Sequence, residues 1–174
     1  MFGNWASFGQ GLAQSWSGNP LEGIVAMRAA LVTQKSAHVG FFHTVHLGFL
    51  AEAHAGIGER ELALALLDEA IALATTKEGH YEAELHRMRG EVLLPQDEAA
   101  AEAGFERALS IARRQSAKLW ELRAAVSLAR LWRDQGRRDD ARNLLAPVYG
   151  WFTEGFATPD LQAAKELLDT LHGA

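Results

Sequence analysis

Apolar residues recur every three or four positions along most of the chain, which is the spacing of one face of an α-helix. The pattern is clearest from Leu119 to Phe152, where two apolar stripes are separated by Gly136. A glycine ends a helix readily because it takes the left-handed backbone conformation at little steric cost. This stretch predicts two antiparallel helices, of which the second runs to Phe152 and is bent or weakened by Pro147.

The stripe of that second helix occurs four times in one register. It starts at Gly23, Ala63, Ala101 and Ala141, so successive copies are 40, 38 and 40 residues apart. The preceding helices repeat less regularly. The pattern predicts four helical hairpins, at about 3–35, 40–75, 80–114 and 117–152.

A last amphipathic helix is expected at 159–172, after an N-cap at Thr158 and a proline in its first turn. It pairs an apolar face with a charged one, as the terminal cap of a helical stack requires. We therefore expect one domain, 1–174, that is all-α: four hairpins and a C-terminal capping helix.

The small-large-small pattern of the repeated stripe resembles the tetratricopeptide repeat, a helix-turn-helix unit of about 34 residues. The residues that show this pattern are Ala63, Leu67 and Ala70; Ala101, Phe105 and Ala108; and Ala141, Leu145 and Val148. The spacing is longer than that of the family, and the prolines that usually close each repeat are missing. The resemblance implies a tetratricopeptide-like α-α superhelix with extended loops.

A narrower resemblance covers the run EAELHRMRGEVLL at 82–94 and the segment 121–168. These stretches are similar to the C-terminal repeat region of large bacterial regulators that carry a class III nucleotide cyclase domain and an AAA-type ATPase domain. The resemblance implies a sensory or protein-interaction segment. The chain has no phosphate-binding loop and no cyclase-like metal-binding segment, so the activities of those regulators are not carried over.

Composition excludes several classes of protein. The 174 residues include no cysteine, so neither a disulfide framework nor a cysteine-ligated metal site is expected. The N-terminus has no basic region followed by a long apolar run, and no apolar stretch reaches the ~18 residues of a membrane span. We expect a protein of the bacterial cytoplasm, with no membrane partner.

Positive charge gathers in one segment although the chain carries a net charge of −5. Four arginines of the fourth hairpin fall within about a quarter-turn of one another on a helical projection: Arg123, Arg130, Arg133 and Arg137. In tetratricopeptide arrays the first helix of each hairpin lines the concave groove, where guanidinium groups suit carboxylates of an acidic segment. His86 and Glu52 are expected to continue this surface.

The alternative is a solvated helix face whose arginines pair with Glu121, Asp134, Asp139 and Asp140. Nucleic acid is a weaker alternative, because the chain is acidic overall and no reading motif appears.

Chemistry-bearing residues do not form a catalytic pattern. His43 and His46 have helical i, i+3 spacing, which can bring two imidazoles to one metal, but the sequence places no third ligand. Acidic pairs such as Glu82 and Glu84 are two residues apart and point in different directions on a helix. No nucleophile elbow is present. We expect no enzyme activity, no metal and no cofactor.

Four large aromatic residues crowd the N-terminal helix with almost no charge around them: Phe2, Trp5, Phe8 and Trp16. They form the first layer of the core, pack on a second copy, or pack on upstream domains. The expected function is non-catalytic protein or peptide binding in a regulatory or signalling assembly. Self-association into a homodimer is the alternative, and a small-molecule sensor or nucleic-acid binder is less favoured.

Overall fold

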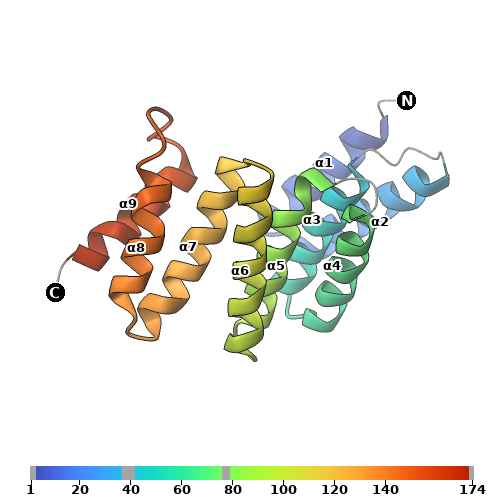
Figure 1. The fold of residues 1–174 in the computed structure, drawn as a ribbon. Coiled ribbons are helices and arrows are strands. Elements are labelled where there is room, and N and C mark those ends of the chain that lie inside the picture. The colour runs from blue at the N-terminus through green and yellow to red at the C-terminus, as the bar shows by residue number, and fades with distance from the viewer. Residues whose placement is uncertain (1–2, 37–41, 76–78, 173–174) are drawn as a thin grey trace. The chain divides into compact units, whose positions relative to one another are not determined.

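A computed structural model describes residues 3–36, 42–75 and 79–172; side chains at 3–5, 34–36 and 172 are outside the description. The described residues form helices and connecting turns, with no strand among them. The all-α prediction is confirmed (Figure 1). The chain divides into two compact units, Met1–Met88 and Arg89–Ala174, and each is described by itself.

The first unit holds two complete hairpins. Helices α1 (Gly3–Trp16) and α2 (Pro20–Ser36) form one, and α3 (His43–Gly56) and α4 (Arg60–Ala74) form the next. A 3-10 turn, η1 (Gly79–Tyr81), leads into α5 (Glu82–Leu93), inside which the two units divide. Helices α1 and α2 approach closely because Gly11 and Gly23 face each other: a Cβ on Gly23 would lie 2.4 Å from the Gly11 carbonyl oxygen.

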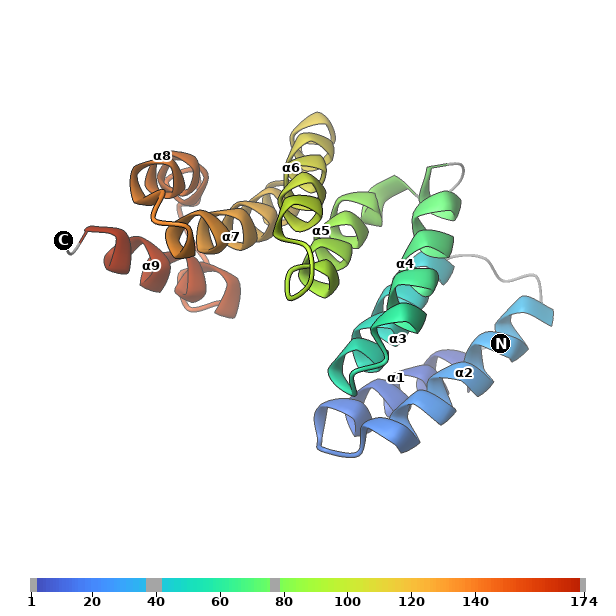
Figure 2. The same cartoon turned by 90° about the horizontal axis from the view of Figure 1, so that it is seen from below.

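The second unit is built around α7 (Lys118–Asp134), which packs against α6 (Glu98–Arg114), α8 (Arg138–Tyr149) and α9 (Pro159–His172) (Figures 1 and 2). Every residue of α7 from Ala124 to Ala129 is buried. Alanines at three of these positions leave room for three neighbouring helices, because small side chains let helix backbones approach.

Four helix-ending turns share one geometry. Residues Gly18, Gly58, Ser116 and Gly136 take a positive φ, and the next residue donates its N–H five residues back along the chain. The N···O distance of this bond is 3.0 Å at Glu59 and 2.7 Å at Arg137. This is the hydrogen bonding of a Schellman cap, which satisfies carbonyls that the helix end leaves open. Ser116 takes the left-handed conformation without being glycine.

The second helix of the fourth hairpin is shorter than expected. It ends at Tyr149, not at Phe152, with Pro147 in its last turn and Gly150, a residue of low helix propensity, at its C-cap. Phe152 still packs, partly buried, against the core of the second unit.

Candidate functional site

The arginine-bearing part of the second unit is the candidate site. Arg123, near the start of α7, donates from Nε to Oδ1 of Asp160 at 2.7 Å, and its guanidinium lies 5.5 Å from the ring centre of Trp120. Asp160 belongs to the first turn of α9. The contact joins α7 to α9 through two residues that are 37 positions apart in the sequence. Arg123 therefore already has a structural partner.

Arg137 lies beyond the end of α7, in the turn before α8. The projection that placed it on one helical face with the other arginines was wrong, because α7 ends at Asp134. Its guanidinium lies 4.4 Å from the ring centre of Trp132 and donates to Glu102 at 2.9 Å and to Asp140 at 3.1 Å.

Glu102 completes a small network around that turn. Its Oε1 accepts from Trp132 Nε1 at 2.6 Å as well as from Arg137. The Trp132 hydrogen bond, assisted by Arg137 and opposed by burial, lowers the pKa of Glu102. The same carboxylate, with Asp140, raises the pKa of Arg137. Arg137 therefore braces the α6–α7–α8 packing.

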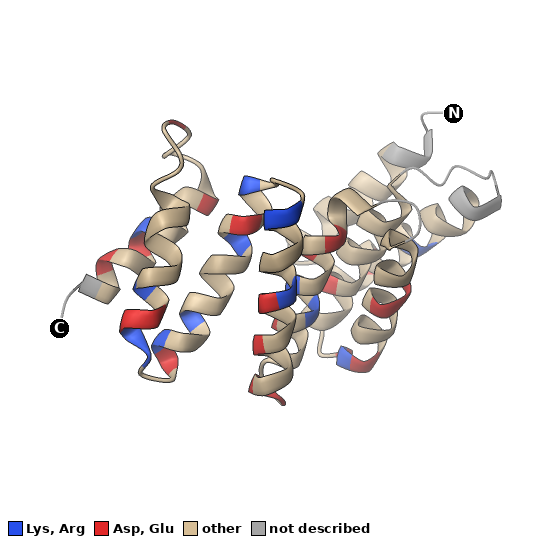
Figure 3. Ribbon diagram, viewed as in Figure 1, with Lys and Arg blue, Asp and Glu red and all other residues tan. Residues whose placement is uncertain are grey.

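The other two arginines have fewer ion-pair partners. Arg133 donates from Nε to the neighbouring Asp134 at 2.8 Å, an exposed pair. Arg130 is exposed, and among the described residues no carboxylate pairs with it. Figure 3 shows basic positions following one another along α7, with acidic positions only near its two ends. Among the four predicted arginines, Arg130 is the one that no described carboxylate pairs with.

Two further residues predicted for this surface, Glu52 on α3 and His86 on α5, lie in the first unit. Glu52 is exposed and His86 is half-buried. Their grouping with the arginines stays a prediction.

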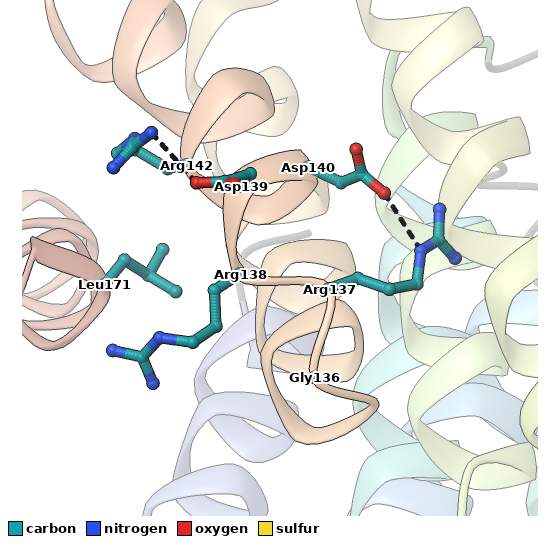
Figure 4. A pocket seen from close by; sticks show the side chains of 7 residues that line it. All are labelled: Gly136, Arg137, Arg138, Asp139, Asp140, Arg142 and Leu171. Atoms are coloured by element: carbon teal, nitrogen blue, oxygen red, sulfur yellow. Dashed lines mark hydrogen bonds and ion pairs between the residues drawn. The ribbon is translucent and has the colours of Figure 1, made fainter. Parts of the chain in front are cut away.

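An open depression of about 400 Å³ lies where the α7–α8 turn meets the end of α9 (Figure 4). Its charged side chains are already engaged. Arg137 pairs with Asp140, Arg142 pairs with Asp139 at 2.9 Å, and Arg138 donates to the backbone carbonyl of Thr170. Leu171 adds one apolar wall. A polar depression with paired charges has little to offer a small molecule, which usually binds in a mostly apolar pocket.

The aromatic residues predicted for self-association have different environments. Phe2 and the side chain of Trp5 lie outside the described residues. Phe8 is 3% exposed and stacks on His46 with ring centres 4.0 Å apart, so its own unit covers it. Trp16 is 68% exposed and touches Phe49 edge-on. Of the two described side chains, only Trp16 can reach a partner without rearrangement.

A second exposed group, at the N-terminal end of α7 and in the α8–α9 loop, was missed by the sequence reasoning. Leu119, Trp151 and Phe156 are large and exposed, and Lys118 Nζ lies 5.6 Å from the Trp151 ring centre. The sequence does carry a signal for it: Trp151 and Phe156 stand on either side of a short segment that contains Gly155, and neither belongs to the apolar stripe of a predicted helix.

A buried carboxylate lies beneath this group. Glu121 is 5% exposed and accepts from Lys118 at 2.7 Å and from Arg113 at 3.0 Å. Burial raises the pKa of Glu121, but the hydrogen bonds from these two cations outweigh it, and the net pKa is lowered. Glu121 therefore stays ionised at neutral pH and anchors the start of α7 to the end of α6.

The histidines serve packing in the described structure. His54 is buried, and its Nδ1 lies 2.6 Å from Glu59 Oε2, while its Nε2 has no hydrogen-bond partner. In the described part of the chain, no three His, Asp or Glu side chains gather closely enough to hold a metal ion. Within the same residues, no helix is both long and apolar enough to cross a membrane.

Comparisons with known proteins agree with the fold. No family model matches the chain, and no curated protein matches it significantly. Among solved structures, the nearly identical tetratricopeptide-like repeats of a Podosopora anserina protein described as a kinesin light chain align with a TM-score of 0.69 and 17% identity. A variant of those repeats aligns with a TM-score of 0.70 and 16% identity. Each alignment covers 96% of this chain and 84% of the other.

At such low identity the likeness shows the fold alone. The chain is similar to tetratricopeptide-like repeats, and its architecture is an all-α helical repeat.

Proposed function

We propose that the chain is a non-catalytic protein-binding module that holds an acidic segment of its partner against the exposed side of α7. The observation that carries the proposal is that Arg130, which is exposed and which no described carboxylate neutralises, lies between two further arginines on one side of α7. Helical repeats of this kind offer extended surfaces suited to peptides and proteins. The repeats therefore supply a rigid support for a cationic contact.

Two neighbouring arginines extend that contact along α7. Arg123 precedes Arg130 by two turns and Arg133 follows it by one turn, so the three share one side of the helix. Exposed ion pairs such as Arg133–Asp134 contribute only about 0–1 kcal/mol, so a ligand carboxylate can take over the guanidinium at small cost. Arg137 is left out of this surface because it braces the turn.

The cellular setting is proposed from the sequence. The similarity of 82–94 and 121–168 to the repeat region of bacterial cyclase and ATPase regulators supports a role in a regulatory or signalling assembly in the bacterial cytoplasm. The acidic segment would then belong to a protein of that assembly.

The test is selection of binders from a display library of random peptides on the immobilised chain. Asp- and Glu-rich sequences should be enriched on the wild type and on Arg107→Glu. That control reverses the charge of an exposed arginine of α6 that has no ion-pair partner among the described residues. The Asp- and Glu-rich sequences should not be enriched on Arg130→Glu. Equal enrichment on both variants, or enrichment of basic peptides, would remove Arg130 from the binding surface.

Folding must be checked in parallel. Arg130→Glu and Arg107→Glu should keep the wild-type helical circular dichroism and melting temperature within a few degrees, because both side chains are exposed. Loss of binding with intact folding then reports the surface itself.

A further inference from the structure

The second helices of the four hairpins bury the same register positions. Each one places a small residue, then a large one, then another small or β-branched residue in the core. These triplets are Gly23, Met27 and Ala30 in α2; Ala63, Leu67 and Ala70 in α4; Ala101, Phe105 and Ala108 in α6; and Ala141, Leu145 and Val148 in α8. All twelve residues are buried. The register therefore aligns the helices position by position.

Four of the aligned positions that are exposed in every copy of the register follow one line along the helix. In α4, α6 and α8 they hold acidic, amide or small residues: Glu61, Ala65, Asp68 and Ala72; Ala99, Ala103, Glu106 and Ser110; Asp139, Asn143, Ala146 and Gly150. In α2 they hold Leu21, Val25, Arg28 and Val32. Leu21, Val25 and Val32 are 66%, 69% and 72% exposed. We call these four residues the α2 outer stripe.

The side chains of the outer stripe lie mostly in solvent in the described part of their unit. Helix α2 packs against α1 and α3, and the side opposite the stripe supplies the buried residues Gly23, Met27 and Ala30. A helix that is apolar on both sides is normally buried on both. Three aliphatic side chains left in water on one helix therefore indicate a surface that another helix covers.

We propose that the α2 outer stripe is the contact through which two copies of this chain form a symmetric dimer, α2 against α2. Two-fold dimers are the commonest oligomers, and their contact uses the same patch on both copies. The spacing of the stripe, one residue per helical turn along a single line, suits a second helix with the same spacing.

Charge favours a second copy at this helix. The chain has a net charge of −5, and the outer positions of α4 carry Glu61 and Asp68, so copies approaching through α4 repel each other. The α2 outer stripe itself holds no acidic residue, and Arg28 is its one charged member. Arg28 can lay its apolar stem along the stripe and keep its guanidinium at the edge.

The size of the stripe sets the strength of the dimer. Each copy offers roughly half of the ~800 Å² that one partner contributes to a standard interface. Such a small interface is typical of weak association, so we expect a micromolar dissociation constant. Helix α7 belongs to the other unit and is not part of the proposed dimer contact. This proposal therefore goes beyond the proposed function and is tested separately from it.

The first experiment is sedimentation velocity of the full chain from low micromolar to high micromolar concentration. The wild type should shift from monomer to dimer, and Val25→Glu/Val32→Glu should remain monomeric throughout. The matched control is Ala65→Glu/Ala72→Glu, which adds the same charge at the equivalent exposed positions of α4 and should dimerise like the wild type. A monomeric wild type at all concentrations, a dimer that survives in Val25→Glu/Val32→Glu, or growth beyond the dimer overturns the proposal.

A second readout uses the absence of cysteine from the sequence. Val25→Cys should form an intermolecular disulfide under mild oxidation several-fold faster than Ala65→Cys, because only the α2 outer stripe is held near its copy. Equal rates for the two variants would overturn the contact even if a dimer forms. Helical circular dichroism equal to that of the wild type confirms that each variant is folded.

Discussion

Helix α2 of the first hairpin and helix α8 of the fourth bury matching residues and expose different ones. Met27 and Leu145 occupy the same core position, and both are 0% exposed. On the outside, Val25 of α2 stands where α8 has Asn143. The comparison shows that packing and surface recognition depend on different positions of one repeat. The buried register maintains the packing of hairpins, and the outer positions are free to differ in what they bind.

The turns of the second and fourth hairpins make the same point. The chain reverses with one backbone geometry at Gly58 and at Gly136. The side chains that close it are His54 with Glu59 in the second hairpin, and Trp132 with Arg137 in the fourth. One backbone motif therefore accepts either a hydrogen-bonded pair or a cation over an aromatic ring.

The largest effect should come from breaking the shared core. Met27→Ala and Leu145→Ala remove large buried side chains, and each should cost about 2–5 kcal/mol of unfolding free energy. Urea denaturation followed by circular dichroism measures both. The exposed controls Val25→Ala and Asn143→Ala should stay within about 0.5 kcal/mol of the wild type. A core variant that behaves like its control would mean that the two helices do not share a register.

The next prediction compares the first core position of α2, which is Gly23, with that of α8, which is Ala141. A Cβ at Gly23 would meet the Gly11 carbonyl oxygen at 2.4 Å and the Ser15 backbone nitrogen at 2.7 Å, so Gly23→Ala should cost about 1–3 kcal/mol despite the better helix propensity of alanine. Thermal melting measures the loss. At the equivalent position in α8, Ala141→Gly should cost about 1–2 kcal/mol, from the lower helix propensity of glycine and from the buried methyl group that it removes. A stabilised Gly23→Ala would show that α1 and α2 do not pack this closely.

A third prediction concerns acid. Glu102 and Glu121 both have lowered pKa values in the folded chain, so each contributes stability that is present above the ordinary glutamate pKa and is lost as the pH falls through the lower, folded value. Glu121→Gln should cost about 1–2 kcal/mol at neutral pH, because hydrogen bonds to charged groups are worth that much.

The measurement is the melting temperature of wild type and Glu121→Gln from neutral pH to below about pH 4, the ordinary range of glutamate. The gap between the two proteins should close as the pH falls. Glu98→Gln, at an exposed N-terminal position of α6, is the control and should show a much smaller gap. A gap that stays constant with pH would show that Glu121 is not held by its ionic partners.

The smallest effect is the coupling within the turn of the fourth hairpin. A double-mutant cycle of Trp132→Leu and Arg137→Ala should give a small favourable coupling, from the cation–π contact and from the Glu102 carboxylate that both side chains share. A cycle of Trp132→Leu with Arg142→Ala, whose arginine pairs with Asp139 instead, should give a coupling near zero.

The sequence predicted the parts of this structure that depend on local spacing. The buried register of Ala63, Leu67 and Ala70 was predicted from periodicity, and the start of α9 at Pro159 from capping chemistry. Such features are encoded within a few turns of helix.

The failures involve tertiary contacts. The pairing of Arg123 with Asp160 joins positions 37 residues apart, and no periodicity reports it. Phe8 is buried because His46, on another helix, stacks on it. The outer residues of α2 were visible in the sequence, but their meaning required knowing which face of the helix is covered.

The proposed binding surface on α7 is tested most directly by amide chemical-shift mapping of the second unit's helices in the full chain with an acidic peptide taken from the display selection. We predict shifts that concentrate around Arg123, Arg130 and Arg133 on α7 and disappear in Arg130→Glu. Shifts confined to the outer positions of α6, at Ala103, Glu106 and Ser110, or spread evenly over all helices, would contradict the account.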